Sequence, residues 1–450
     1  MSGGKLPEGW VDTQLGNIVD YGKANKRVLS DVNDDTWVLE LEDIEKESSK
    51  LLSTIRASER PFKSTKNSFK KGDVLYGKLR PYLNKIIIAK EDGVCTTEII
   101  PLSAEPLCCN KYIFYWLKSS TFLGYVNDVS YGVNMPRLGT ADGLKAPLRL
   151  APLGEQKIIA EKLDALLAQV DSTKARLEQI PQILKRFRQA VLIAAFTKKL
   201  TESSEFTEKK ISDVCSFQNG FAFKSSWFSK TGSYQVIKLA NIRDGYLFLE
   251  NAPAYVNEEQ GVEFSKFSPN IGDVLISMTG TRFKKDYGFG CIMTQKHKAL
   301  INQRVGRLIP IKASILPEYL FLFVRSELFR EQFFKGETGG VNQGNVGSQH
   351  IQSILINVPP LTEQHEIVRR VEQLFAYTDT IEKQVNNALA LVNSLTQSLL
   401  AKAFRGELTA QWRAENPDLI SGESSAAALL ERIKAERAAS GGKKNSLKKA

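Results

Sequence analysis

The sequence is poor in histidine and cysteine and has no long apolar run. Its 450 residues include three histidines and five cysteines, and no two cysteines form a CxxC pair. A metal site or a disulfide framework is therefore not expected, and the thiol content fits a reducing cytoplasm. Apolar runs such as residues 190–196 are far shorter than the roughly 20 residues that a membrane span requires. Residues 1–7 lack the apolar core of a signal peptide. We expect a cytoplasmic protein without a membrane segment.

Sequence motifs of catalysis are missing as well. No Gly-x-x-x-x-Gly-Lys-Ser/Thr loop occurs, because Gly77-Lys78 is followed by leucine, and there is no Gly-x-Ser-x-Gly elbow. The glycine-rich run at residues 339–347 does not follow a strand of a βαβ unit, so it does not predict a dinucleotide site. The pattern favours a binding protein without catalytic residues or cofactors. A self-contained nuclease or methyltransferase is the alternative.

Positive charge is in excess. Lysine and arginine number 61 against 50 aspartate and glutamate residues, which gives a net charge of +11. Much of the excess lies in residues 431–450, which contain seven basic and two acidic side chains. Such a surplus is a mild indication of a polyanionic partner.

The chain contains an internal repeat of long period. Residues 152–156 (PLGEQ) recur as residues 360–364 (PLTEQ), and the Gly-Asp-Val-Leu of residues 72–75 recurs at residues 272–275. A period of about 200 residues excludes a solenoid of short units. The repeat therefore indicates two similar modules in tandem.

The repeat divides the chain into five predicted regions. Runs of β-branched and aromatic residues predict strands at residues 74–76, 85–89, 235–237 and 274–276. Short helices are predicted at residues 111–118 and 318–325, so the modules belong to the α+β class. The regions are a first globular domain (1–150), a first helical region (151–201), a second globular domain (202–358), a second helical region (359–413) and a C-terminal short helix with a basic tail (414–450).

Both helical regions carry apolar residues at 4-3 spacing, which is typical of a coiled-coil seam. The predicted seam consists of Ile159, Leu163, Leu166, Val170, Leu177, Ile180 and Leu184 in the first region and Ile367, Val371, Leu374, Ile381, Val385, Val392 and Leu395 in the second. One helix alone cannot bury such a stripe, so we expect the two helices to pack on each other in a pseudo-two-fold arrangement. Two core helices inside separate domains are the alternative. Pro181 lacks an amide hydrogen and predicts a break or kink near residues 179–180.

The C-terminal segment has a pattern of its own. An amphipathic helix is predicted at residues 424–438, followed by a basic disordered tail at residues 441–450. A partner-docking helix with a phosphate-contacting tail explains this pattern, and so does a solubilising end.

Two related modules at a fixed separation suit duplex DNA, because two half-sites present the same groove geometry at a constant distance. Each module has a candidate contact loop after its Gly-Asp-Val-Leu. In such loops arginine binds guanine, lysine neutralises phosphate, and asparagine or threonine reads base edges. The candidates are Lys78, Arg80, Tyr82, Asn84 and Lys85 in the first module and Thr279, Thr281, Arg282, Lys284 and Lys285 in the second. A solvated hairpin with surface cations is the competing explanation.

Two further segments are candidates for the same role. One contains Lys23, Lys26 and Arg27, loosely matched in the second module by Asn219 and Lys224. The other is a repeated Gly-Val-Asn segment, with Asn134 and Arg137 in the first copy and Asn342, Gln343 and Asn345 in the second. A loop that leads into the following long helix is the competing explanation for the Gly-Val-Asn segment.

Three stretches of the sequence carry a family resemblance. Residues 6–10 (LPEGW), 155–164 (EQKIIAEKLD) and 402–409 (KAFRGELT) resemble the specificity subunit of Type I restriction–modification systems, and the IA family in particular. The order of variable domain, helical region, variable domain, helical region and short tail resembles this family over the whole chain.

The resemblance implies a non-catalytic subunit whose two target-recognition domains each read one half of a bipartite, asymmetric site in double-stranded DNA. It implies that the helices form an antiparallel coiled coil, which sets the spacer and docks two modification subunits. These subunits would bind S-adenosylmethionine and methylate adenine, and two restriction subunits would use ATP and Mg²⁺. This chain would bind no cofactor. The base-contacting residues do not carry over, because family members differ in their recognition domains. A coiled-coil scaffold without DNA specificity is a further alternative.

Overall fold

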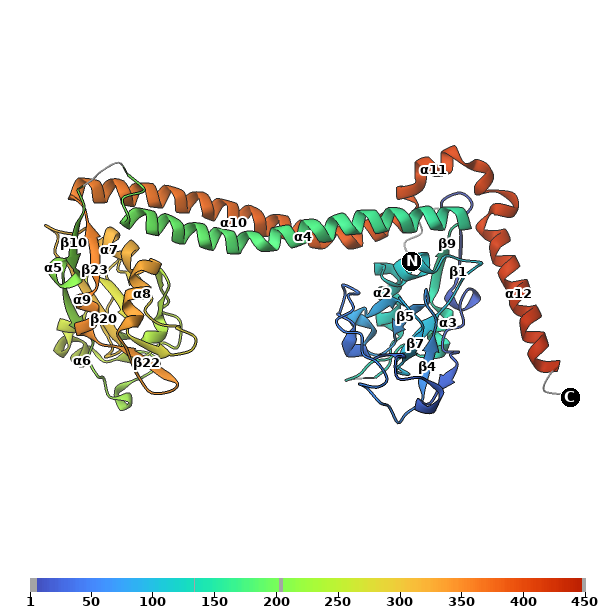
Figure 1. Ribbon diagram of the computed structural model, residues 1–450, viewed down its shortest axis with the longest axis horizontal. Helices are drawn as coiled ribbons and strands as arrows, with labels where there is room; N and C mark the ends of the chain where they lie inside the picture. The colour runs from blue at the N-terminus through green and yellow to red at the C-terminus, as the bar shows by residue number, and fades with distance from the viewer. Residues whose placement is uncertain (1–5, 133, 202–204, 447–450) are drawn as a thin grey trace. The chain divides into compact units, whose positions relative to one another are not determined.

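The computed structural model describes residues 6–132, 134–201 and 205–446, with 440–446 described by their backbone alone (Figure 1). The chain divides into two compact units: unit 1 contains Met1–Arg176 and Ala388–Ala450, and unit 2 contains Leu177–Asn387. Each unit has a globular part made of strands and short helices. We call them the first module (strands β1 to β9) and the second module (strands β10 to β23). The α+β class predicted from the sequence is confirmed.

Three small sheets build the first module. Its two ends pair with each other, because β1 (Val11–Gln14) lies antiparallel to β9 (Pro147–Leu150). A three-stranded sheet has β5 (Val74–Gly77) between β6 (Ile86–Ile88) and β8 (Ile99–Leu102). A four-stranded sheet has the order β2 (Lys26–Arg27), β4 (Lys66–Phe69), β7 (Gly93–Cys95) and β3 (Trp37–Leu39). The helices are α1 (Asn110–Leu117), α2 (Ser120–Val129) and α3 (Thr140–Lys145).

The second module repeats this plan with more strands. Its ends also pair, β10 (Thr207–Lys210) with β23 (Leu355–Val358). A four-stranded sheet has the order β11 (Cys215–Asn219), β20 (Val305–Pro310), β16 (Val274–Ser277) and β18 (Gly290–Ile292). A three-stranded sheet has the order β15 (Tyr255–Val256), β12 (Tyr234–Ile237) and β19 (Ala299–Ile301). The others pair β13 (Ile242–Arg243) with β14 (Tyr246–Leu247), and β17 (Thr279–Thr281) with β22 (Gln343–Val346) and β21 (Glu337–Gly339). Its helices are α5 (Ile211–Val214), α6 (Glu258–Glu263), α7 (Pro317–Val324), α8 (Glu327–Lys335) and α9 (Ser348–Ser353).

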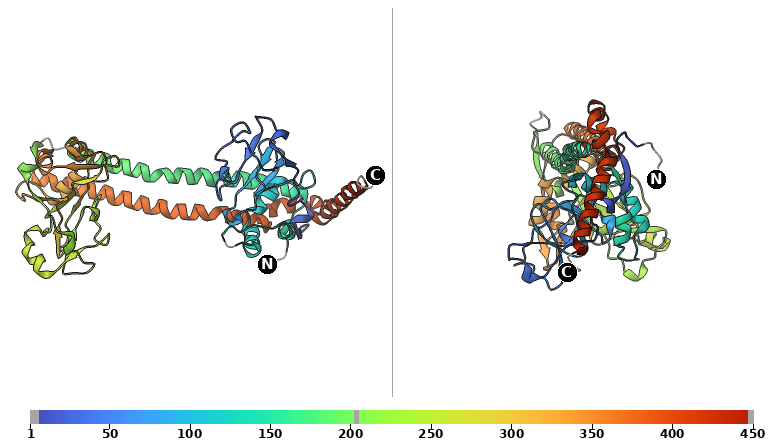
Figure 2. Two further views of the ribbon diagram at one scale, coloured as in Figure 1. Left: turned by 90° about the horizontal axis from the view of Figure 1, so that it is seen from below. Right: turned by 90° about the vertical axis from the view of Figure 1, so that its right-hand side faces the viewer.

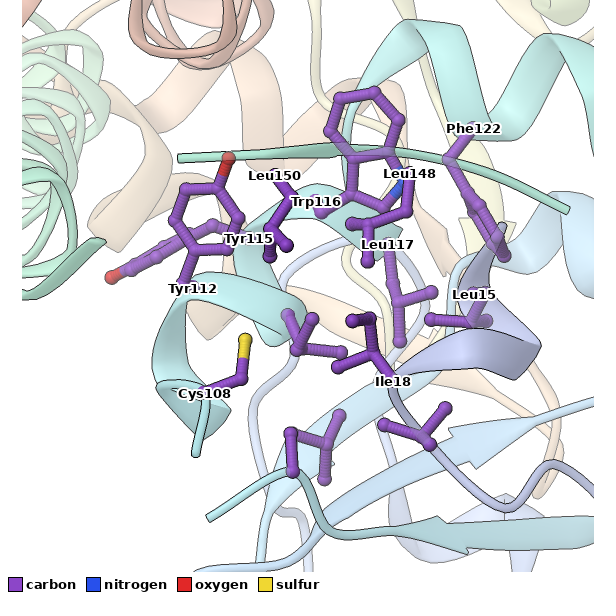
Figure 3. Close-up of a cluster of buried hydrophobic side chains, with 14 of the residues drawn as sticks. Leu15, Ile18, Cys108, Tyr112, Tyr115, Trp116, Leu117, Phe122, Leu148 and Leu150 are labelled. Carbon is purple, nitrogen blue, oxygen red and sulfur yellow. The ribbon is translucent and has the colours of Figure 1, made fainter. Parts of the chain in front are cut away.

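An aromatic helix forms the centre of the core in each module. In the first module Tyr112 and Trp116 of α1 are almost completely buried (Figure 3). They share a cluster with Leu15, Ile18, Leu117, Phe122, Leu148 and Leu150. Their rings lie 5.3 Å and 5.0 Å from the ring of Phe404. Helix α7 takes the same place in the second module, which confirms the two short helices predicted from the sequence.

Two long helices, α4 (Leu153–Phe196) and α10 (Leu361–Phe404), contribute to both units. In unit 1, Ile159 near the start of α4 and Leu400 near the end of α10 lie in one buried cluster. In unit 2 the order is reversed, since Phe196 at the end of α4 lies with Ile367 near the start of α10. The helix segments of unit 2 lie side by side in both views (Figures 1 and 2). The helices therefore pack antiparallel within each unit, and burial in unrelated cores is excluded.

Of the break or kink predicted near residues 179–180, the break is wrong, because α4 is helical without interruption from Leu153 to Phe196. The proline is itself exposed, while Leu184 one turn later is buried. Packing of the apolar stripe on both sides of the proline outweighs the local loss of one main-chain hydrogen bond. Although α4 is long, neither it nor any other described helix is long and apolar enough to cross a membrane.

The predicted seam positions differ in burial. The buried ones are Ile159, Leu163, Val170, Leu184, Ile367, Val371, Val385 and Val392, and the partly buried ones are Leu166, Leu177, Ile180, Leu374 and Ile381. Leu395 is 42% exposed, so its assignment to the seam is wrong. The buried stripe of α10 passes instead from Val392 through the half-buried Thr396 to Leu400. An α-helix with 3.6 residues per turn drifts away from a strict seven-residue repeat, which explains the shift.

The C-terminal segment packs on unit 1. Helix α12 (Ala426–Ser446) follows α11 (Ala410–Glu415), and its apolar residues, from Ala426 to Ile433, lie in the core cluster of unit 1. The main-chain N–H of Ala426 donates to the carbonyl of Gly9 at 2.9 Å. The apolar face that the sequence offered to a partner is thus covered by this chain. Helix α12 extends to Ser446, past residue 441 where the predicted disordered tail begins, and residues 447–450 lie outside the described residues.

Candidate nucleic-acid interface

In each module, the loop after Gly-Asp-Val-Leu pairs with the segment around Gly-Val-Asn. In the first module Leu79 pairs antiparallel with Arg137. In the second, β17 pairs with β22, and Thr279 lies opposite Asn345. Leu79 and Thr279 follow their Gly-Asp-Val-Leu at the same distance, and Arg137 and Asn345 correspond in the repeat. Two of the three candidate segments are therefore brought together, and in the same register in both modules.

The hydrogen bonds beside this pairing are also repeated. The main-chain N–H of Leu138 donates to the carbonyl of Lys78 at 3.1 Å, and that of Val346 donates to the carbonyl of Met278 at 2.9 Å. We call residues 78–85 with 134–137 the first paired loops, and residues 278–286 with 337–345 the second paired loops. Their backbones are built alike, whereas their side chains differ.

Most of the predicted side chains in the paired loops reach solvent. The exposed ones are Arg80, Tyr82, Lys284, Lys285, Asn342 and Gln343, and the half-buried ones are Lys78, Lys85, Thr281 and Arg282. Two surface hollows flank these loops. One of about 200 Å³ is lined in part by Arg80 and Met135, and one of about 480 Å³ in part by Lys285 and Arg330.

The predictions for Asn84 and Thr279 are wrong. Asn84 is 5% exposed and Thr279 is 7% exposed, so neither side chain presents itself to DNA. Asn84 ends the short turn Pro81–Leu83 with a positive φ of 49°, a conformation that asparagine tolerates better than most residues. Its place in the loop is therefore explained by the backbone.

Several of the predicted cations are held by protein groups. Lys85 Nζ donates to the carbonyl of Leu41 at 2.7 Å. Arg282 Nε donates to Glu337 Oε2 at 3.1 Å, and its Nη1 donates to the carbonyl of Gly340 at 3.4 Å. Because Glu337 and Gly340 lie on the opposite loop, Arg282 ties the second paired loops together. Its observed role is to position them.

Both carboxylates that hold such arginines were missed from the sequence. Glu337 accepts from Arg282, and Glu98 accepts from Arg137 of the first paired loops at 3.2 Å. Glu337 also accepts from the hydroxyl of Tyr287. Burial, and then this hydrogen bond to Glu337, raise the pKa of Tyr287 well above its usual value. An acidic residue far along the chain gives no sequence signal of such a contact.

The third candidate segment, with Lys23, Lys26 and Arg27 in the first module and Asn219 and Lys224 in the second, lies outside the paired loops. Lys26 and Arg27 form the exposed edge strand β2, where Lys26 Nζ donates to Asn67 Oδ1 at 2.7 Å. Lys23 is exposed and pairs with Asp20 at 3.6 Å. In the second module Asn219 ends β11, and the exposed Lys224 lies over the ring of Trp227 at 5.5 Å. None of these contacts joins the segment to the paired loops.

Comparison with known proteins assigns the chain to a family. The family described as "Type I restriction modification DNA specificity domain" matches residues 7–182 and 203–391, which include each module once. The chain belongs to this family. The resemblance inferred from the sequence is thereby confirmed, and the chain is a Type I specificity subunit.

Relatives of this specificity subunit are similar over most or all of its length. The Type I restriction enzyme EcoKI specificity subunit of Escherichia coli (strain K12) is 39% identical over an alignment of 497 positions that covers 100% of each chain. The EcoBI specificity subunit of Escherichia coli is 42% identical over 388 residues, which cover 81% of this chain and 80% of the relative. The StySPI specificity subunit of Salmonella potsdam is 44% identical over 364 residues, which cover 78% and 76%.

Solved structures support the fold of the specificity subunit. The HsdS subunit from Thermoanaerobacter tengcongensis matches with a TM-score of 0.62 at 20% identity and covers 90% of this chain and 99% of its own. A chain from a study of complex assembly and conformational transition of the type I R-M system matches with a TM-score of 0.70 at 19% identity, with the same coverage. Two globular domains with a long helical region are therefore confirmed.

The three stretches that carry the family resemblance meet inside unit 1 of the specificity subunit. Glu155, at the start of α4, is fully buried and accepts from Trp10 Nε1 at 2.7 Å and from Thr409 Oγ1 at 2.6 Å. It also forms an ion pair with Arg413 of α11. The N-terminal stretch, the helix start and the C-terminal stretch thus share one buried carboxylate, which gives these motifs a structural reason.

Four of the five cysteines of the specificity subunit are buried. Burial raises the pKa of Cys215 and of Cys291 to about 12, so both stay protonated at neutral pH. Across residues 6–132, 134–201 and 205–446, no group of three histidine, cysteine, aspartate or glutamate side chains is arranged to hold a metal ion.

Proposed function

We propose that this specificity subunit reads DNA for a Type I restriction–modification complex, and that each module reads one half of a bipartite, asymmetric site. The observation that carries the proposal is the repeat of the paired loops. Both modules use the same main-chain pairing, Leu79 with Arg137 and Thr279 with Asn345, to present different side chains. One scaffold with two sets of side chains suits two half-sites of different sequence.

The exposed side chains of the loops have the chemistry for this task. Arg80, Lys284 and Lys285 are exposed, and no carboxylate within the paired loops pairs with them among the described contacts. Such cations bind phosphate or, in the case of arginine, guanine. Asn342 and Gln343 expose amides that can donate to and accept from base edges. We assign phosphate binding to the lysines and base reading to the amides and Arg80.

The long helices have a proposed role in the complex. In each unit the antiparallel packing of α4 on α10 buries part of the module core against both helices, as Phe404 against Trp116 illustrates. A helix pair fixed to both modules would set the unspecified spacer between the half-sites. We further propose that it docks two modification subunits. S-adenosylmethionine, ATP and Mg²⁺ would then be used by these subunits and by two restriction subunits, and by no residue of this chain.

Exchange of one module tests the reading of half-sites. Residues 10–145 are replaced by the corresponding segment of a related specificity subunit, and the methylated motif is determined by sequencing host DNA. One half of the motif should change, while the other half and the spacer stay the same. A change in both halves would contradict the assignment of one module to one half-site.

Binding measurements separate this function from its alternatives. The subunit, assembled with its modification partner, should retard the bipartite duplex more than a scrambled duplex at equal, stated salt. Equal retardation of both duplexes, with normal assembly, would favour a scaffold without DNA specificity. Cleavage or methylation by the lone chain would favour a self-contained enzyme.

A lysine variant with a matched control adds a finer test. Lys284→Ala should weaken binding of all duplexes alike and lower the slope of log affinity against log salt by about one, because one phosphate contact is lost. Lys312→Ala removes an exposed lysine of the same module outside the loops and should leave the slope unchanged. Equal slopes of log affinity against log salt for the two variants would mean that Lys284 does not contact phosphate.

A further inference from the structure

The two most exposed large apolar side chains among the described residues lie on the second paired loops. Phe283 is 76% exposed and Val341 is 77% exposed. The main-chain N–H of Arg282 donates to the carbonyl of Asn342 at 3.3 Å, so the neighbours of the two apolar residues are in contact. Phe283 and Val341 therefore stand on adjoining loop tips. Leaving this much apolar surface in water is unfavourable unless a partner covers it.

The tip that carries Phe283 is held firmly at its base. The N–H of Thr281 donates to Asp286 Oδ1 at 2.6 Å, and the N–H of Lys285 donates to the carbonyl of Thr281 at 3.0 Å. The guanidinium of Arg282 is bound to Glu337 on the other loop. A side chain on such a base loses little conformational freedom when it binds, because the loop is already ordered.

The charges around Phe283 select the kind of partner. Arg282 precedes the ring, and Lys284 and Lys285 follow it. The two carboxylates within the paired loops are already engaged, since Asp286 accepts from the Thr281 amide and Glu337 accepts from Arg282. The tip is therefore an apolar ring framed by cations. This combination matches nucleic acid, where charged phosphates enclose an apolar base stack, better than it matches an apolar protein surface.

The first module shows the same arrangement with other residues. Tyr82 is 50% exposed and Met135 is 45% exposed, one on each of the first paired loops. The N–H of Arg80 donates to the carbonyl of Pro136 at 2.7 Å, so these residues again adjoin. Each module thus presents one aromatic and one aliphatic side chain beside an exposed cation. This recurrence argues against an accidental exposure of Phe283.

We infer that Phe283, with Val341 beside it, enters the base stack of the half-site bound by the second module, as an apolar wedge between neighbouring base pairs. Tyr82 and Met135 act in the same way in the first module. The inference rests on the proposed function. An inserted wedge unstacks a base step, and pyrimidine–purine steps unstack most easily. The wedge thus adds a preference for a flexible step at a position where no hydrogen bond reads a base.

The test uses the full chain assembled with its modification subunits and a duplex with 2-aminopurine at successive positions of the second half-site. Unstacking raises the fluorescence of this base, so the wild type should show a rise at one step. Phe283→Ala should abolish the rise and weaken binding about tenfold, while Phe283→Trp should keep both. Tyr246→Ala is the matched control, since it removes another exposed aromatic residue of the second module, on β14.

The outcomes are distinguishable. A fluorescence rise that persists in Phe283→Ala, or a loss of affinity no larger than in Tyr246→Ala, would overturn the wedge while sequence-specific binding by the wild type still supports the proposed function. Absence of sequence preference in the wild type would overturn the proposed function itself. Failure of Phe283→Ala to assemble with the modification subunits would assign the ring to a protein interface and would also overturn the wedge.

Discussion

Asn357 donates a hydrogen bond from Nδ2 to the main-chain carbonyl of Phe196, the last residue of α4, at 2.9 Å. In unit 1 the equivalent bond runs from Arg149 Nη1 to the carbonyl of Phe404, the last residue of α10, at 3.0 Å. Each donor lies on the strand that closes its module, and each acceptor ends the long helix of the other repeat. The two repeats are therefore interlocked, because each module binds the end of the long helix that follows the other module in the chain.

This interlocking predicts the effect of removing the donors. Carbonyls in the last turn of a helix lack intrahelical partners, and a cation there also interacts favourably with the helix dipole. Arg149→Ala should therefore lower the free energy of unfolding by about 1.5–3 kcal/mol, and Asn357→Ala by about 1 kcal/mol. Urea denaturation measures both. Arg369→Ala, on the exposed face of α10, should cost less than about 0.5 kcal/mol. Equal costs for the three variants would show that the helix-end bonds contribute nothing.

The buried carboxylate of Glu155 predicts a strong dependence on its partner. Arg413→Ala leaves Glu155 buried with two neutral donors, Trp10 and Thr409, and no cation. Loss of one member of a buried ion pair costs about 3–5 kcal/mol, so unit 1 should be severely destabilised. Adding Glu155→Gln to Arg413→Ala should recover part of this loss, because no buried charge remains. Denaturation of the single and double variants decides the matter, and additive losses would contradict the prediction.

Two leucines on α10 provide a matched test of the helix packing. Leu400 is fully buried in the core cluster of unit 1, whereas Leu395 is 42% exposed. Leu400→Ala should cost about 2–5 kcal/mol, because it removes buried contacts and leaves a cavity. Leu395→Ala, with the same change of side chain and little change in helix propensity, should cost less than about 0.5 kcal/mol. Comparable losses in urea denaturation would mean that the seam lies where the strict heptad places it.

Much of the fold could be predicted from the sequence because it is periodic on two scales. The long repeat predicts two modules, and the 4-3 spacing predicts two packed helices. The failures are local. Pro181 lies in an unbroken helix, and Leu395 faces solvent. In both cases tertiary packing over many turns decides the outcome, whereas a short sequence window sees only the proline or the ideal heptad.

The candidate interface was predictable as a region but less so by residue. The Gly-Asp-Val-Leu and Gly-Val-Asn repeats locate the paired loops, since duplicated loops have duplicated contacts. The sequence did not predict which side chains of the loops point outward, as the buried Asn84 and Thr279 show. Glu337 was missed because its contact with Arg282 spans 55 residues of chain. Phe283 was passed over because a single aromatic residue in a loop carries no periodic signal.

Burial of Lys118 predicts a pH dependence of stability. The side chain is 8% exposed, and its Nζ donates to Ser49 Oγ at 2.7 Å. Burial lowers the pKa of Lys118 from 10.5 to about 8. Below pH 8 the lysine is protonated in both the folded and the unfolded chain, and the buried charge reduces stability by a constant amount. Between pH 8 and 10.5 only the unfolded chain binds the proton, so stability rises with pH in this window.

Lys118→Met should remove this penalty while keeping the length of the side chain. The variant should be more stable than the wild type at pH 7, by on the order of 3 kcal/mol, because the shift in the pKa of Lys118 no longer opposes folding. The advantage should shrink as the pH approaches 10.5. Urea denaturation from pH 7 to 10.5 measures the trend, with Lys111→Met as the control, since this exposed lysine of α1 pairs with Asp164. A constant difference between wild type and Lys118→Met across the range would mean that the lysine reaches water in the folded chain and carries no penalty.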